Sequence, residues 1–140
     1  MKNIYLLDIE GANKANVKYA LQNDFRIITI KMPSQIEEDQ PNLIMPGNGA
    51  FGYYISFLKD NKWETILSSI INQKNCGKLL SICSGFQALG NSSEESKDVE
   101  GLKLIDYSFY NVNKYFNSSL IINIGRKEIE EVKDFLELKD

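Results

Sequence analysis

The sequence predicts an α/β domain, a three-layer sandwich in which helices cover both faces of a mostly parallel sheet. Short apolar runs alternate along the chain with amphipathic stretches, and several of the runs end in turns that contain glycine or proline. This alternation is typical of parallel βαβ units. A chain of 140 residues is long enough to bury one core without disulfides, so residues 1–140 are predicted to form a single domain.

Each expected element follows from its local pattern. The apolar positions between Trp63 and Ile71 recur at intervals of three and four residues, which is the spacing of a helix packed on a sheet. Asn13 precedes another helical pattern, formed by Val17, Ala20 and Leu21, and can cap that helix. A closing helix is expected at 126–138, and the segment 107–119 has no clear pattern. Strands are expected at 3–9, 26–30, 42–45, 78–82 and 120–124, with a weaker one at 102–105.

The composition argues against several classes of function. Sixteen basic residues stand against 19 acidic ones, and the net charge of -3 does not favour nucleic acid or an anionic membrane. No segment approaches the roughly 20 apolar residues needed to cross a bilayer. Acidic residues also interrupt the first apolar run before it reaches signal-peptide length, so a cytoplasmic protein is expected. With two cysteines and no histidine, we expect no zinc site and no cofactor.

One stretch, LLSICSGFQALG at 79–90, looks like a buried strand that turns sharply into a helix at Cys83. Small residues on both sides, Ser81 and Gly85, permit the tight strand-to-helix turn that presents a nucleophile. The alternative is that Cys83 fills space in the core, as most free cysteines do. For the other cysteine, Cys76, packing is the expected role.

A second unusual turn, PGNG at 46–49, follows the strand at 42–45. In a parallel sheet the carboxyl ends of the strands face the crevice where ligands bind, so this turn and the Cys83 turn are expected to line one cleft. The N–H of Ser84 and a peptide at Gly47-Asn48 would then be suitable donors for an oxyanion. The glycines are equally compatible with an ordinary turn.

Several ordered motifs carry a family resemblance that extends over about residues 3 to 106. They are LLDIEGAN at 6–13, PGNGAF at 46–51, SICSGFQAL at 81–89, SEES at 93–96 and GLKLI at 101–105. With these motifs the chain resembles the class I (triad) glutamine amidotransferases, and within them the glutaminase subunits of imidazole glycerol phosphate synthase in histidine biosynthesis. The resemblance implies a flavodoxin-like fold.

The resemblance also implies an activity. In that family a cysteine attacks the side-chain amide of glutamine, forms a glutamyl thioester and releases ammonia to a barrel-shaped cyclase partner. A carboxylate such as Glu95 is chemically suited to pair with the α-ammonium group of glutamine, although it also fits a solvated loop acid. The implied roles are Cys83 as nucleophile, Gly47, Asn48 and Ser84 as oxyanion donors, and Gln87 and Glu95 as glutamine ligands.

The sequence departs from the family after Asp106. The family's His-Ser-Tyr turn and its His-Pro-Glu motif, which supplies the base and its orienting acid, have no counterpart in these 140 residues. We therefore expect an internally shortened domain with a reduced C-terminal part and weak or absent glutaminase turnover. A missing acid or base typically costs about 10²–10⁴-fold in rate.

Three hypotheses follow from this departure. The chain is a reduced amidotransferase subunit, a pseudoenzyme that binds glutamine or a cyclase subunit without chemistry, or a protein with a redox-sensitive cysteine at Cys83.

Overall fold

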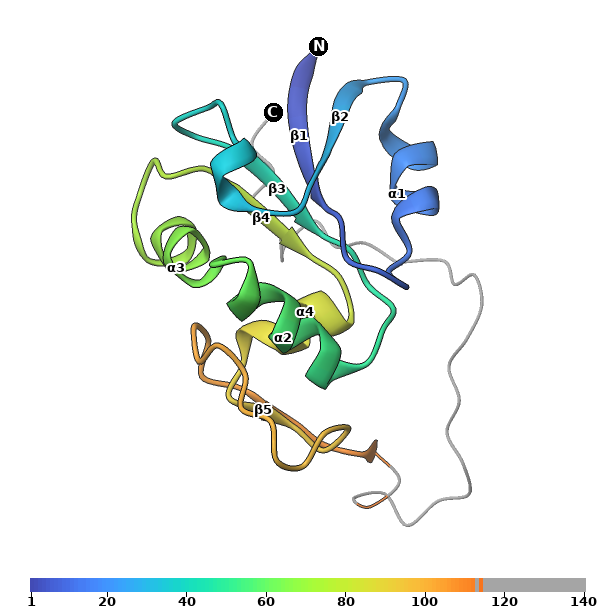
Figure 1. Cartoon of the computed structure of the whole chain (residues 1–140), viewed down its shortest axis with the longest axis vertical. Coiled ribbons are helices and arrows are strands. Elements are labelled where there is room, and N and C mark those ends of the chain that lie inside the picture. Colours follow the sequence, from blue (N-terminus) through green and yellow to red (C-terminus); the bar gives the residue numbers. More distant parts are fainter. Residues whose placement is uncertain (113, 115–140) are drawn as a thin grey trace, which may run out of the picture.

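The computed structural model describes residues 1–112 and residue 114. Its centre is a four-stranded parallel sheet in the order β2-β1-β3-β4 (Figure 1). The prediction of an α/β class with a parallel sheet is confirmed, and four of the six expected strands lie within two residues of their predicted bounds. The strands are β1 (Lys2–Leu7), β2 (Phe25–Ile30), β3 (Asn42–Met45) and β4 (Lys78–Ser81).

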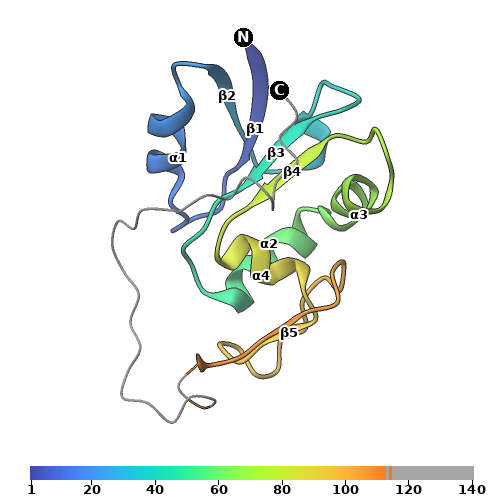
Figure 2. The same cartoon turned by 180° about the vertical axis from the view of Figure 1, so that it is seen from behind.

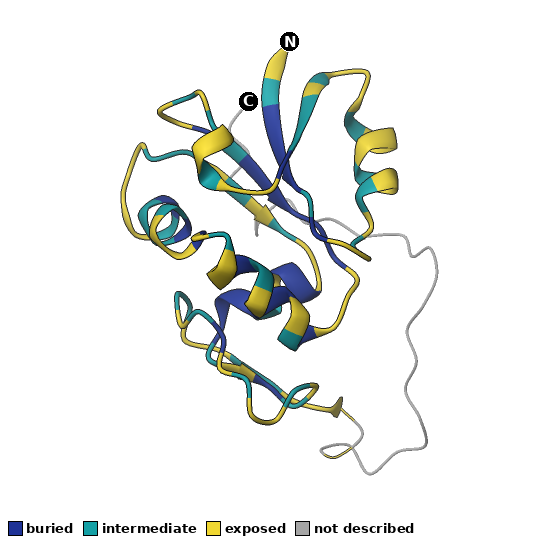
Figure 3. Cartoon of the chain, in the orientation of Figure 1, coloured by how far each residue is buried: buried dark blue, intermediate teal, exposed yellow. Residues whose placement is uncertain are grey.

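Helices lie on both faces of this sheet because its buried strands are apolar on both sides (Figures 1 and 2). Helix α1 (Lys14–Leu21) packs on one face through Val17 and Leu21, against a small cluster that includes Leu6. Its Ala20, which was expected to face inward, is exposed. On the opposite face α2 (Phe51–Asp60) and α3 (Glu64–Asn72) cover the main core, and the buried residues concentrate there (Figure 3).

Helix α3 matches the predicted helix at 63–71 within one residue. Trp63 precedes it, is fully buried, and donates its indole N–H to the carbonyl of Lys31 at 2.8 Å. Asn13 is the N-cap residue of α1, as expected, but its side chain makes no capping hydrogen bond.

Helix α2 is an element that the sequence analysis missed. Its buried residues Phe51, Tyr54, Ile55 and Leu58 recur at helical spacing. A short 3-10 helix, η1 (Pro33–Gln35), connects β2 to the loop before β3.

The weak strand predicted at 102–105 is wrong. The amides of Leu102, Leu104 and Ile105 donate to the carbonyls of Ala88 and Leu89, at the end of α4 (Ser84–Leu89). These bonds satisfy carbonyls that a helix end leaves without partners, and they use the groups that a strand would need. The nearest strand is instead β6 (Ser108–Phe109), which pairs with β5 (Ser92–Ser93) in a separate two-stranded sheet.

The strand predicted at 120–124 and the helix predicted at 126–138 lie outside the described residues. Within residues 1–112 and 114, no helix has the length and apolar character needed to cross a membrane.

Candidate functional site

Cys83 lies at a strained turn between β4 and α4. It is the N-cap residue of α4 and has φ 50° and ψ −115°, in the positive-φ region that non-glycine residues rarely adopt. Such strain costs of order 1–3 kcal/mol and persists only where the surrounding structure enforces it. The side chain is exposed, so this cysteine does not fill the core.

Close packing around the turn explains why it has this shape. A Cβ atom at Gly85 would lie 2.8 Å from the carbonyl oxygen of Met45 and 2.9 Å from the hydroxyl of Tyr54. Because glycine has no Cβ, the first turn of α4 can approach the end of β3 this closely. The backbone must therefore turn within two residues of Ser81, the last residue of β4.

The glycine loop, defined here as residues 46–49, lies directly beside Cys83. Strands β3 and β4 pair in register from Asn42 to Met45, so their carboxyl ends emerge together. A Cβ atom at Gly47 would lie 2.9 Å from the Cβ of Cys83 and 3.0 Å from the carbonyl oxygen of Ile82. The two turns picked out in the sequence thus touch.

The amides predicted to serve as oxyanion donors take no part in the hydrogen bonds of the fold, as far as the chain is described. Within residues 1–112 and 114, the N–H groups of Gly47, Asn48 and Ser84 have no hydrogen-bond acceptor. The amides that follow Ser84 do not share this property, since those of Gly85 and Phe86 donate to the carbonyls of Ile82 and Cys83. Ser84 itself is buried, and its hydroxyl also has no partner in the described part of the chain.

A hollow of about 200 Å³ opens at this point, and Cys83 lies in its wall. The thiol is the one titratable side chain among the described residues that line it, because the others are amide, aliphatic or glycine residues. The lining residues are Asn13, Val17, Gly47, Asn48, Ile82 and Cys83.

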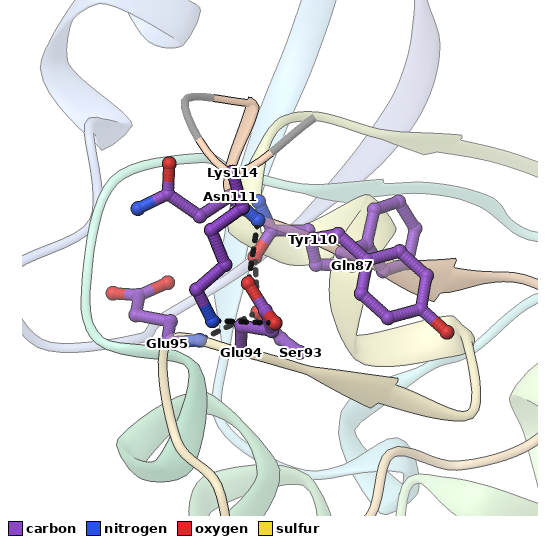
Figure 4. Close-up of a pocket in the computed structure, with 8 residues that line it drawn as sticks. Gln87, Ser93, Glu94, Glu95, Tyr110, Asn111 and Lys114 are labelled. Atoms are coloured by element: carbon purple, nitrogen blue, oxygen red, sulfur yellow. Dashed lines mark hydrogen bonds and ion pairs between the residues drawn. The ribbon is translucent and has the colours of Figure 1, made fainter. Parts of the chain in front are cut away.

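A second hollow, of about 340 Å³, contains the predicted glutamine ligands (Figure 4). Gln87 comes from α4, where its backbone N–H donates to the carbonyl of Cys83 at 3.0 Å, and Glu95 comes from the loop after β5. The side chain of Glu95 is exposed. The lining residues are Gln87, Ser93, Glu94, Glu95, Phe109, Tyr110, Asn111 and Lys114.

An ion pair crosses this second hollow. Lys114 Nζ lies 2.8 Å from Glu94 Oε1, and the amide of Asn111 donates to Glu94 Oε2 at 2.8 Å (Figure 4). The hydrogen bond from Lys114, followed by the one from Asn111, lowers the pKa of the Glu94 carboxyl. Ser93 Oγ lies at 3.5 Å from Gln87 Oε1 and accepts a hydrogen bond from the amide of Glu95.

The structure therefore divides the predicted site residues between two hollows. Cys83, Gly47 and Asn48 line the first hollow. Gln87, one turn further along α4 than Cys83, lines the second together with Glu95 from the loop after β5. Ser84 lines neither hollow, and its backbone lies beside the first. The roles of these residues in binding and catalysis stay predictions.

Sequence reasoning did not single out three residues of this region for a role in the site. Asn13 was expected only to cap α1 and match a family motif, yet it lines the hollow of Cys83. Lys114 lies in a segment without a clear pattern, and Tyr54 lies on the helix that was missed. No group of three or more His, Cys, Asp or Glu residues suited to hold a metal ion occurs in the part of the chain described.

Comparison with known proteins relates the chain to the class I glutamine amidotransferases. Several of the relatives are HisH subunits of imidazole glycerol phosphate synthase. The subunit of Methanothermobacter thermautotrophicus is 33% identical over 102 residues, which are 73% of this chain and 50% of that protein. The subunit of Pyrococcus furiosus is 39% identical over 103 residues, 73% of this chain and 48% of that protein.

A third relative matches more of the chain. HisH 1 of Methanococcus maripaludis is 27% identical over 134 residues, 94% of this chain and 64% of that protein. The chain thus spans about half the length of the first two relatives and somewhat more of the third. No protein-family model matches it.

Proposed function

We propose that the chain is a glutamine amidotransferase-like protein that binds glutamine and forms a glutamyl thioester at Cys83. The observation that carries the proposal is the exposed, strained Cys83 turn in contact with Gly47, flanked by amides that have no acceptor among the described residues. The relatives support the same chemistry, since they are subunits of imidazole glycerol phosphate synthase. By the same argument we propose that a cyclase subunit is the partner that receives the ammonia.

The proposed reaction begins with attack of the Cys83 thiolate on the side-chain amide carbon of glutamine. A carbon–sulfur bond forms, and the carbonyl oxygen takes up the negative charge, which the N–H groups of Gly47, Asn48 and Ser84 would stabilise. Collapse of this intermediate breaks the carbon–nitrogen bond, and the nitrogen must gain a proton to leave as ammonia. Water then hydrolyses the thioester to glutamate and restores the thiol.

The last two steps need proton transfer, and the hollow around Cys83 offers little help with it. Its described lining has no titratable side chain besides the thiol, and the 140 residues contain no histidine. Each missing acid or base slows a step by about 10²–10⁴-fold. We therefore propose slow turnover and a long-lived thioester in a shortened amidotransferase domain.

The same observation favours a second candidate function. A hollow whose described lining has no acid or base besides the thiol suits a pseudoenzyme that binds glutamine, or a cyclase subunit, without releasing ammonia. The two candidates differ in whether a covalent adduct forms.

Intact-mass spectrometry after incubation with glutamine separates them, combined with an ammonia assay run with and without a cyclase subunit. The proposed function predicts a glutamyl adduct on Cys83 that is absent from Cys83→Ser and retained in the matched control Cys76→Ser. Binding of glutamine by calorimetry without any adduct would support the pseudoenzyme. Absence of both binding and adduct would refute the proposed function.

A further inference from the structure

Three successive carbonyls, from the last residue of β3 into the glycine loop, each accept a hydrogen bond from a different segment of the chain. The carbonyl of Met45 accepts from the amide of Ile82 at 3.0 Å. The carbonyl of Pro46 accepts from the hydroxyl of Tyr54 at 2.9 Å. The carbonyl of Gly47 accepts from the amide of Asn13 at 2.8 Å. The donors to Met45 and Gly47 are backbone amides, which do not depend on the side chain. The donor to Pro46 is the side-chain hydroxyl of Tyr54.

Tyr54 is placed between the two turns of the candidate site. It lies on α2, is fully buried, and its hydroxyl hydrogen-bonds the residue directly before Gly47. The same hydroxyl lies 2.9 Å from where a Cβ at Gly85 would stand, so it also touches the first turn of α4. One polar atom thus contacts both the glycine loop and the helix that follows Cys83.

The hydrogen bond from Tyr54 to the Pro46 carbonyl also affects the Gly47 amide, because the two groups share one peptide bond. The carbonyl of Pro46 and the amide of Gly47 belong to one planar, trans peptide and point in opposite directions. A donor that fixes the carbonyl therefore fixes the amide as well. The carbonyl points to Tyr54, and the amide points away from it without an acceptor in the described residues.

We propose that Tyr54 is a positioning residue whose hydroxyl holds the Pro46–Gly47 peptide so that the Gly47 amide stays available as an oxyanion donor beside Cys83. This inference rests on the proposed function. Tyr54 does not act as an acid or base, because burial, and then the charge of a Cys83 thiolate, raise the pKa of its hydroxyl well above the ordinary value. It remains a protonated donor.

The first test observes the peptide directly and does not depend on glutamine chemistry. Tyr54→Phe removes the hydroxyl and keeps the ring. Tyr5→Phe is the matched control, because Tyr5 is equally buried and its hydroxyl accepts from the amide of Glu37, on a loop without predicted site residues. In NMR spectra, Tyr54→Phe is expected to shift or broaden the Gly47 amide signal, and Tyr5→Phe to leave it unchanged. An unchanged Gly47 signal in Tyr54→Phe would overturn the inference.

The second test separates positioning from a general structural role. Iodoacetamide reacts with any accessible thiolate, whereas the diazoketone analogue of glutamine has a carbonyl that uses the oxyanion donors. Loss of one such donor typically lowers a rate by about 10²–10³-fold, and a misaligned donor by less. We expect Tyr54→Phe to slow diazoketone labelling of Cys83 by about 10-fold or more and to leave iodoacetamide labelling within about twofold. Equal slowing of both reagents would indicate a structural role and refute positioning.

A conservative replacement keeps the test decisive if Tyr54→Phe unfolds. With para-aminophenylalanine at position 54, the amino group can still donate to the Pro46 carbonyl, so labelling and the Gly47 signal should return toward those of the parent protein. Failure of this variant to restore either, in a folded protein, would count against the inference. If the parent protein itself resists the diazoketone, the proposed function fails, and the Gly47 signal still decides the role of Tyr54.

Discussion

Contact between Gly47 and Cys83 predicts an energetic coupling that a double-mutant cycle can measure. A Cβ at position 47 would lie 2.9 Å from the Cβ of Cys83, 3.0 Å from the carbonyl oxygen of Ile82 and 3.2 Å from its Cγ2. Gly47 does not have positive φ, so Gly47→Ala would cost free energy through crowding alone. Crowding of this kind in a packed region typically costs about 1–3 kcal/mol.

Cys83→Gly removes the closest of the three contacting atoms. It also relieves the positive φ at position 83, where the strain of a non-glycine residue costs of order 1–3 kcal/mol. Gly47→Ala should therefore destabilise the Cys83→Gly protein less than it destabilises the parent. Because both contacts to Ile82 remain, Cys83→Gly relieves only part of the crowding around the added Cβ. We expect a coupling free energy between the two substitutions of at least about 0.5 kcal/mol.

Urea unfolding of the four proteins, followed by the fluorescence of the buried Trp63, measures the cycle. Gly11→Ala is the control substitution, because Gly11 has φ +75° and nothing within 4 Å of the added Cβ. Its cost should add to that of Cys83→Gly within about 0.5 kcal/mol. If the effects of Gly47→Ala and Cys83→Gly are equally additive, the glycine loop does not pack on Cys83, and the site is wrong.

Three further predictions concern stability. Lys14 hydrogen-bonds Asp8 and thereby lowers the pKa of the Asp8 carboxyl below 3.8, so Lys14→Gln should cost about 0.3–1 kcal/mol near neutral pH. The two proteins should converge as the pH falls through the lowered pKa of folded Asp8, which urea unfolding at a series of pH values would reveal. Leu67→Ala should lose about 2–5 kcal/mol in urea unfolding because Leu67 is fully buried, whereas Leu80→Ala should change stability by about 0.5 kcal/mol or less because Leu80 is 55% exposed. The pKa of Tyr54 is raised by burial, so above about pH 10 the unfolded chain ionises this group while the folded one does not. Thermal unfolding should therefore show that the parent protein loses stability more steeply above that pH than the Tyr54→Phe variant does.

Much of the sheet was predictable because its strands are short, apolar and followed by residues that break strands. Asn42–Met45 matches its predicted bounds at both ends, where Pro41 precedes the strand and Pro46 follows it. The failure at 102–105 has a different origin. A run of four residues with three apolar members fits a strand and a helix-capping loop equally well. The outcome depends on the carbonyls at the end of α4, which the local pattern does not contain.

The candidate site was predictable to the extent that its parts lie at the ends of adjacent strands. The rule that parallel strands deliver their carboxyl ends to one edge was enough to bring the loop of Gly47 beside Cys83. The separation of Gln87 and Glu95 into another hollow was not predictable. It depends on where the chain runs after α4, and Phe109 and Lys114, which line that hollow, lie in a segment without periodicity.

Tyr54 shows where sequence reasoning reaches its limit. Its spacing with Phe51, Ile55 and Leu58 is helical, but the residues before Phe51 are a glycine turn and an alanine N-cap without a capping side chain, so no helix-start signal precedes the pattern. Recognising the helix would still have assigned Tyr54 to the core, because an aromatic residue at a buried helical position ordinarily packs. A buried hydroxyl nevertheless needs a partner, and the carbonyl it takes here belongs to Pro46. The requirement to satisfy one buried hydroxyl thus links a core helix to the loop beside Cys83.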